Sequence, residues 1–370
     1  GGIMTDIIKS KSNLPSTIPL LNKFILIKEQ QLESQKAEIK AIKSAELGAE
    51  VEKQKIWEAE QTAEIVLDAT TRLGELLAEL PKPKFNKPIN GSLRGTIESL
   101  PPGISKKRSH QAQTLAKNKA IVEQEKAKAK EKDDLPTPKK IYRIIKHQER
   151  KNKLKNEVIK AVSNKPPIVK LSDAIEWLNL QKEVDLLLTD PPYSTDVNDI
   201  YKFASSWLPL ALTTLKPTGR AYVCIGAYPQ ELHAYLSVSM PSQILVWTYK
   251  NTLGPTPTNL YKQNWQAILY YQMPDAPKIN CPIMLEQFSV QDINAPDGRL
   301  GDRYHAWQKP MELAERFIKH STEPEQIVID PFCCTGTFLL AAAKLGRISR
   351  GCDNNEDNLN IAIERGCVRE

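Results

Sequence analysis

The N-terminal part of the chain follows a helical pattern of apolar positions. Between Phe24 and Leu80 the sequence contains no proline and only two glycines. Apolar residues recur there at helical spacing, in two stripes: Ile25, Leu32, Ile39 and Ile42, then Ile65, Leu73, Leu76, Leu77 and Leu80. The pattern predicts one or two long amphipathic helices. Because such helices need a partner surface, we expect them to pack on each other or to pair two subunits.

A smaller helical module is expected after the proline-rich residues 81–92. Residues 93–100 can form a short helix, Pro101-Pro102-Gly103 predicts a turn, and Ser105 is placed to cap a helix from Lys106 to about Lys119. This order is typical of a helix-turn-helix reader of DNA, and a surface helical hairpin is the alternative. The side chains expected to bind DNA are Lys106, Lys107, Arg108, His110 and Gln111. A charged linker is expected at roughly 123–157.

From about residue 166 short apolar runs alternate with helical stretches. Strands are expected at 184–189, 220–225, 243–249, 265–271, 326–330 and 348–352, and helices at about 200–215, 229–238, 309–320, 337–345 and 355–365. Alternating strands and helices predict a mostly parallel sheet with helices on both faces. The chain therefore divides into three expected parts: 1–80, 81–165 and 166–370.

Charge and cysteine content narrow the partners. The net charge of the 370 residues is +7, but residues 81–165 alone hold 23 Lys or Arg against 8 Asp or Glu. Such a local excess indicates an anionic partner such as nucleic acid, although a solvated linker is the alternative. Six cysteines without a C-x-x-C pair argue against a zinc site and against disulfides, so no metal is expected. No secretory signal or membrane span is expected, so the protein should be intracellular.

One candidate for catalysis follows the strand at 184–189. Asp190, Pro191, Pro192 and Tyr193 come directly after this strand, and ligands in open α/β sheets bind beyond the carboxyl ends of strands. The Asp190 carboxylate and the Pro191 carbonyl could together accept both hydrogen bonds of an –NH2 group. Tyr193 could stack on a flipped-out base. A simple strand-ending turn is the alternative.

A second motif predicts a nucleoside site. The strand that ends at Asp330 leads through a turn of small residues into a helix, and the next strand ends in Asp353, an acid that could hold ribose hydroxyls. This motif alone does not distinguish S-adenosylmethionine from a dinucleotide. Its candidate cofactor-binding residues are Asp330, Pro331, Phe332, Cys334, Gly336, Thr337 and Asp353.

Together the two motifs closely resemble the DNA amino-methyltransferases of the β arrangement, in which Asp-Pro-Pro-Tyr precedes the cofactor loop. The resemblance covers roughly residues 166–370 and includes His305-Ala306-Trp307-Gln308-Lys309-Pro310, an element that in the family lies beside the cofactor. It implies a Rossmann-like α/β methyltransferase domain with a seven-stranded sheet in permuted order, preceded here by an α-helical domain. It also implies S-adenosylmethionine as cofactor, with Gln308 and Lys309 near it. Through the runs Thr71–Leu77 and Gly103–Lys107, the N-terminal module resembles one that precedes methylase domains in phage and mobile-element proteins.

The chain departs from the family pattern at several positions. Cys334 replaces the first glycine of Gly-x-Gly-Thr, Gln266 stands where many relatives carry Glu, and Asp353 stands where Glu is usual. Residues 272–304 are also short for a target-recognition region, so the basic module is the expected reader of sequence.

The activity implied by the resemblance is methyl transfer to adenine N6 in double-stranded DNA, with the base flipped out of the helix. Asp at the first motif position favours adenine, because the cytosine-N4 enzymes of the family more often have Ser there. The alternatives are a cytosine-N4 or RNA adenine methyltransferase, or an inactive methylase fold that binds DNA. A homodimer or helper subunit through the N-terminal helices is possible, in the cytoplasm or nucleoid of a prokaryote or phage host. Restriction-modification, phage self-protection and regulation remain open roles.

Overall fold

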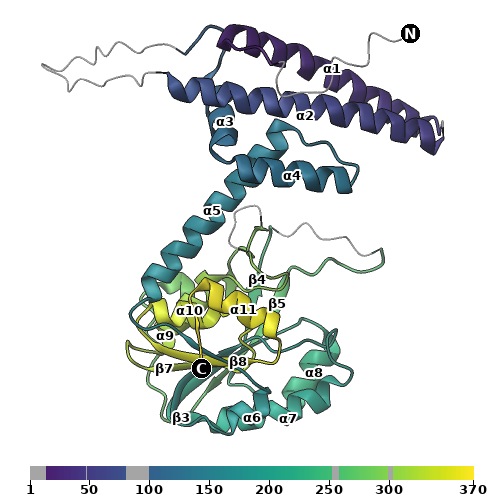
Figure 1. Cartoon of the computed structure of the whole chain (residues 1–370). Coiled ribbons are helices and arrows are strands. Elements are labelled where there is room, and N and C mark those ends of the chain that lie inside the picture. Colours follow the sequence, from purple (N-terminus) through teal and green to yellow (C-terminus); the bar gives the residue numbers. More distant parts are fainter. Residues whose placement is uncertain (1–13, 47, 81–99, 252–257, 299–302) are drawn as a thin grey trace, which may run out of the picture. The chain divides into compact units, whose positions relative to one another are not determined.

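The computed structural model describes residues 14–46, 48–80, 100–251, 258–298 and 303–370 (Figure 1). The chain divides into two compact units, one up to Glu149 and one from Arg150 to Glu370. The three parts expected from the sequence stay a prediction. Within the described ranges, no helix is both long enough and apolar enough to cross a membrane.

Two long helices dominate the first unit, α1 (Ile18–Ser44) and α2 (Ala49–Glu79). They lie along each other in Figure 1, and Leu21 and Ile25 of α1 are buried in one cluster with Val66 and Leu73 of α2. The predicted amphipathic helices are thus confirmed, and their apolar stripes face each other within one chain.

Three more helices follow: α3 (Lys106–Lys117), α4 (Lys119–Glu131) and α5 (Pro138–Val162). Ser105 caps α3 as predicted, because its hydroxyl accepts a hydrogen bond from the Arg108 amide at 3.1 Å. Helix α3 crosses α2 so closely that a Cβ added to Gly74 would lie 2.0 Å from the Ala112 carbonyl oxygen. Most of the expected charged linker, 123–157, falls on α4 and α5, and its role as a linker stays a prediction. The first helix of the expected helix-turn-helix, 93–100, lies outside the described residues except for Leu100.

The described part of the second unit contains one sheet of nine strands, in the order β6-β4-β5-β3-β2-β7-β8-β1-β9. Strand β5 runs antiparallel to its neighbours β3 and β4, and all other pairs are parallel. The resemblance implied seven strands; the short strands β6 and β9 extend the two edges, and neither carries enough apolar sequence to be foreseen. The strands are β1 (Ile168–Leu171), β2 (Val184–Thr189), β3 (Leu215–Ile225), β4 (Gln243–Thr248), β5 (Trp265–Gln272), β6 (Val290–Asp292), β7 (Ile327–Asp330), β8 (Ile348–Asp353) and β9 (Val368–Arg369).

Helices cover both faces of this sheet. Because successive side chains of a strand point to opposite faces, Leu187 of β2 packs with Trp207 of α7, whereas Leu186 and Leu188 pack with Phe317 of α9. Helices α6 (Ala174–Leu178), α7 (Ile200–Thr213) and α8 (Pro229–Val238) contribute to the first layer. Helices α9 (Met311–Ser321), α10 (Thr337–Lys344) and α11 (Glu356–Arg365) form the second. The predicted mostly parallel, doubly covered sheet is confirmed.

Candidate active site

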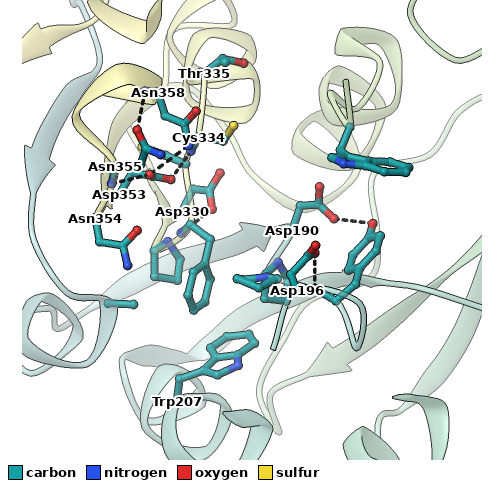
Figure 2. Close-up of a pocket in the computed structure, with 18 of the residues that line it drawn as sticks. Asp190, Asp196, Trp207, Asp330, Cys334, Thr335, Asp353, Asn354, Asn355 and Asn358 are labelled. Atoms are coloured by element: carbon teal, nitrogen blue, oxygen red, sulfur yellow. Dashed lines mark hydrogen bonds between the residues drawn. The ribbon is translucent and has the colours of Figure 1, made fainter. Parts of the chain in front are cut away.

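Three carboxylates meet at the carboxyl ends of neighbouring strands. Asp190 follows β2, Asp330 ends β7 and Asp353 ends β8, and these strands are adjacent in the sheet. All three line a cleft of about 830 Å³, within the usual range for small-molecule sites. Figure 2 shows Asp330 between Asp353 on one side and Asp190 on the other. Both predicted motifs therefore open into one cleft.

The Asp190 carboxylate is held by two side chains. The Tyr193 hydroxyl lies 2.8 Å from Asp190 Oδ1 and 3.2 Å from Gln266 Oε1, so its single proton can serve either oxygen. Lys309 Nζ lies 2.5 Å from Asp190 Oδ2 and 2.7 Å from the Tyr193 oxygen. The Lys309 side chain is only 3% exposed, against 21% for Asp190. Desolvation and the Asp190 charge raise the pKa of Tyr193 well above its ordinary value, so the phenol stays protonated.

Two further acids fix the turn that carries these residues. Asp196 Oδ2 accepts a hydrogen bond from the Tyr193 amide at 3.0 Å. Glu231 of α8 is fully buried; its two carboxylate oxygens accept from the amides of Ser194 and Gly226, at 2.9 and 2.6 Å. These contacts tie the end of the Asp-Pro-Pro-Tyr turn to Asp196 and to α8.

The turn between β7 and α10 is joined to Asp353. Asp353 Oδ2 accepts a hydrogen bond from the Cys334 amide at 2.9 Å, and Oδ1 accepts from the Asn355 amide at 3.0 Å. Cys334 has a φ of 45° and Gly336 a φ of 75°, both in the left-handed region. A side chain at Gly336 would also meet Cys367 Sγ at 2.9 Å. Residue 336 must therefore be glycine. At position 334 the cysteine adopts a left-handed conformation at the cost of backbone strain.

Arg365 of α11 supports this turn from behind. Its Nη1 atom donates to the Thr335 carbonyl at 2.6 Å and to the hydroxyls of Thr335 and Thr337 at 3.0 and 2.9 Å. Arg365 is 4% exposed, and its Cζ atom lies over the Tyr304 ring, 4.4 Å from the ring centroid. A buried cation of this kind determines the shape of the loop.

Asp330 is buried among acids. Its Oδ1 accepts hydrogen bonds from the Thr189 hydroxyl at 2.6 Å and from the Phe332 amide at 3.1 Å. Loss of solvent outweighs these bonds and raises the pKa of Asp330 to about 7, and the charges of Asp190 and Asp353 act in the same direction. A cation bound in the cleft would favour the ionised carboxylate.

Aromatic rings form one wall of the cleft. The Phe332 ring lies edge-on to Trp207 with centroids 5.0 Å apart, and Phe203 lies 5.8 Å from Phe332. Trp207, which belongs to this wall, is labelled in Figure 2. The cleft therefore combines an apolar aromatic wall with three carboxylates.

The structure brings together most of the residues predicted for the site. Those that line the cleft are Asp190, Pro191, Pro192, Tyr193, Gln308, Lys309, Asp330, Pro331, Phe332, Cys334, Thr337 and Asp353. Gly336 caps α10 and is not among the lining residues. Lys309 was expected near the cofactor, and its ammonium group contacts Asp190 and Tyr193. Sequence reasoning missed Glu231 and Arg365, which bind Ser194 and Thr335 across 37 and 30 positions. Asp196 could have been found from the sequence, because it is an acid only three residues after Tyr193.

The residues predicted to bind DNA lie in the other unit, on α3. Lys106, Lys107 and His110 are exposed, and Gln111 is half-buried. Arg108 is half-buried, and its guanidinium forms an ion pair with Glu29 at 3.2 Å, which joins α3 to α1. The DNA-binding role of α3 stays a prediction.

Comparison with known proteins identifies related sequences. Residues 184–364 match the model of the N6/N4 family of DNA methylases. The type II methyltransferase M.HpaI of Haemophilus parainfluenzae is 29% identical over 226 residues, covering 52% of this chain and 72% of that protein. The type II methyltransferase M2.DpnII of Streptococcus pneumoniae is 26% identical over 238 residues, covering 52% and 87%. Among solved structures, the PvuII DNA methyltransferase (cytosine-N4-specific) aligns with a TM-score of 0.47 at 18% identity, over 54% of this chain and 88% of that one.

Proposed function

We propose that this chain, which belongs over residues 184–364 to the N6/N4 family of DNA methylases, transfers a methyl group from S-adenosylmethionine to an exocyclic amino group of a DNA base. The observation that carries the proposal is the position of Asp190. It is a partly exposed carboxylate in a cleft, fixed by Lys309 and Tyr193, and followed directly by the Pro191 carbonyl. An amino group can donate one hydrogen bond to each of these acceptors.

The residues of the tetrapeptide would activate the amine by geometry. Two acceptors that hold both N–H bonds draw the nitrogen lone pair out of conjugation with the ring and orient it. The amine then attacks directly, and no covalent enzyme intermediate is needed. Asp190 is placed to take the proton that the nitrogen loses. Glu231 and Asp196 contribute by fixing the turn, and Tyr193 by offering a ring to a flipped base.

The cleft fits S-adenosylmethionine in charge and in shape. S-adenosylmethionine would supply an electrophilic methyl group on a sulfonium cation. Asp330, buried with a pKa near 7, gains a counter-charge when a cation binds beside it. Asp353 at the end of β8 suits the ribose hydroxyls, and Phe332 offers a face to a nucleobase. The Cys334–Thr337 turn would lie against the amino-acid end of the cofactor.

Adenine N6 is the favoured target because the first residue of the motif is Asp190 rather than Ser. Cytosine N4 is the second candidate, since the family includes both chemistries. An RNA substrate and an inactive DNA-binding fold are the remaining alternatives. The intact tetrapeptide and its hydrogen bonds argue against the inactive fold.

The N-terminal unit is the proposed DNA-binding part. Helix α3 presents Lys106, Lys107 and His110 to solvent, and residues 81–165 have a strong excess of positive charge. A specific protein–DNA interface needs on the order of 1,000 Å², more than the short 272–304 segment is expected to supply. Lys106→Ala with Lys107→Ala should therefore weaken DNA binding and reduce its dependence on salt. Unchanged affinity and salt dependence would leave α3 as a scaffold.

The experiment that tests the function separates cofactor binding from turnover. Calorimetry with S-adenosylmethionine should show lost affinity in Asp353→Ala and nearly full affinity in Asp190→Ala. Methyl transfer to duplex DNA should be lost in Asp190→Ala. Asp292→Ala, which removes an exposed partner of Lys250, is the control and should retain both. Full cofactor affinity in Asp353→Ala would contradict the assigned pocket.

A further inference from the structure

A cysteine, a glutamate and a histidine lie together away from the active-site cleft. Cys281 follows β5, Glu286 lies in the 3-10 helix Met284–Gln287, and His320 is near the end of α9. Cys281 Sγ, one Glu286 carboxylate oxygen and a His320 ring nitrogen all lie within 4.8 Å of one another. Cys281 is 8% exposed and His320 6%, while Glu286 is partly exposed. The three side chains thus converge on one point.

Hydrogen bonds hold the two segments that carry them. The Asn280 amide donates to the His320 carbonyl at 2.8 Å, which fixes the loop to the end of α9. Gln287 Nε2 donates to the Cys281 carbonyl at 2.8 Å, which closes the loop on itself. His320 Nε2 lies 3.1 Å from Glu286 Oε2. The side chains are therefore placed by the backbone and not by mutual attraction alone.

We propose that Cys281, Glu286 and His320 form a binding site for a zinc ion. Thiolate, imidazole and carboxylate are the side chains that bind zinc, and the first two favour it over magnesium and calcium. In a tetrahedral zinc site the ligand atoms lie roughly 3.4–3.8 Å apart, given the usual bond lengths. Small side-chain rotations bring the three atoms to that spacing. A water molecule completes the coordination.

The charges of the site suit a divalent cation. With Cys281 as thiolate and Glu286 ionised, the protein ligands carry two negative charges, which zinc neutralises. Burial lowers the pKa of His320, which favours the neutral imidazole that binds metal. Burial and the Glu286 charge raise the pKa of Cys281, so zinc must displace the thiol proton, as it does on binding other thiols.

The surroundings leave room for the ion. A cavity of about 340 Å³ adjoins the cluster and provides an entry path. The acids and bases of its lining are equal in number: Glu286, Glu312 and Glu315 against Arg316, Lys319 and Arg347. Arg316 Nε lies 3.5 Å from Glu286 Oε1, whereas His320 lies near the other carboxylate oxygen, Oε2. Glu286 can thus hold Arg316 and the ion at the same time.

Cysteine spacing argued against a zinc site, but spacing does not reveal ligands that are single residues from separate segments. A zinc ion there would cross-link the loop that follows β5 to α9. That loop leads into β6, the strand at the sheet edge. The site would stabilise this edge without touching the methyl-transfer cleft.

Metal content of the full-length protein tests the proposal. The protein is expressed without a polyhistidine tag in zinc-supplemented medium, dialysed, and analysed by mass spectrometry for metals. About one zinc per chain is expected, and Cys281→Ser, Glu286→Gln and His320→Gln should each lose most of it. His233→Gln, at an exposed position of α8, is the matched control and should retain the zinc.

Cobalt substitution gives a second, spectroscopic readout of the same site. Co²⁺ added to the chelator-treated wild-type protein should produce the near-ultraviolet absorption band of a cobalt–thiolate bond, and Cys281→Ser should abolish it. Zinc-free wild-type protein with no cobalt band would overturn the proposal. Zinc retained by folded Cys281→Ser and His320→Gln variants would overturn it too. Either result is independent of whether the protein methylates DNA.

Discussion

The ammonium group of Lys309 lies 2.5 Å from Asp190 Oδ2 and 2.7 Å from the Tyr193 hydroxyl, so one buried cation joins two side chains of the same tetrapeptide. Lys309 precedes α9 and is 119 positions from Asp190. The two segments meet because α9 packs against β2 on one face of the sheet. Any base that donates to Asp190 must share this carboxylate with Lys309.

The first prediction concerns the energy of this contact. A double-mutant cycle with Asp190→Asn and Lys309→Met should give a coupling of about 1–3 kcal/mol in urea unfolding, because Lys309 is nearly excluded from water. The matched control is the exposed pair Lys250–Asp292, at 2.7 Å, whose coupling should stay below about 1 kcal/mol. Equal coupling in both pairs would show that burial adds nothing at Lys309.

Sequence patterns predicted the elements that determine the fold better than the contacts that shape the site. The strand Val184–Thr189 was predicted to the residue, because a buried run of apolar residues ends abruptly at Asp190 and two prolines. Strand Ile168–Leu171 was missed, since four residues with one lysine carry too little pattern. Its place is set by pairing with β8, a contact far apart in sequence.

Contacts far apart in sequence also limit what could be predicted of the active site. Asp190, Asp330 and Asp353 could be found because each ends an apolar strand, and neighbouring strand ends share one edge of a parallel sheet. The partner of Asp190 could not be found in this way. The His305–Pro310 element resembles a family element near the cofactor, yet only packing of α9 against the sheet brings Lys309 to Asp190. Glu231 and Arg365 likewise act on backbone atoms that sequence does not display.

The second prediction concerns pH. Because the folded-state pKa of Asp330 is raised to about 7, the folded protein retains a proton that the unfolded chain has lost above pH 4 or so. Asp330 therefore lowers the free energy of unfolding as the pH rises from about 4 to about 7. The ionised form attracts a cationic cofactor, so affinity for S-adenosylmethionine should rise from pH 6 to pH 8, by at most about tenfold per unit.

Calorimetry of wild-type protein and of Asp330→Asn measures this effect. The difference between the two pH profiles isolates Asp330 from the titration of the cofactor's own amino group. Parallel profiles for the two proteins would show that Asp330 does not sense the cofactor.

The third prediction concerns backbone strain at Cys334. Its φ of 45° is costly for any residue with a Cβ. Cys334→Gly should raise the free energy of unfolding by roughly 0.5–1 kcal/mol, after the extra freedom of glycine in the unfolded chain is subtracted. Cys334→Ala removes the thiol but keeps the Cβ, so it should give no such gain. A gain in both variants would assign the effect to the thiol instead.

The fourth prediction concerns Arg365. Arg365→Gln removes three hydrogen bonds to the Thr335–Thr337 turn and should weaken binding of S-adenosylmethionine at least tenfold, because the loop loses its fixed shape. Arg369→Gln is the control, since Arg369 pairs with Glu356 on the surface, and it should bind normally. Normal cofactor affinity in a folded Arg365→Gln protein would show that the bonds from Arg365 to Thr335 and Thr337 do not shape the cofactor site.

The measurement that bears most directly on the central claim is nucleoside mass spectrometry of DNA. DNA is isolated from cells that express the wild-type protein and from cells that express Asp190→Ala. The account predicts N6-methyladenine above the host background with the wild type and none above it with the variant. N4-methylcytosine alone would contradict the choice of adenine. Equal levels of modified bases in both samples, or none above background in either, would contradict methyl transfer at Asp190.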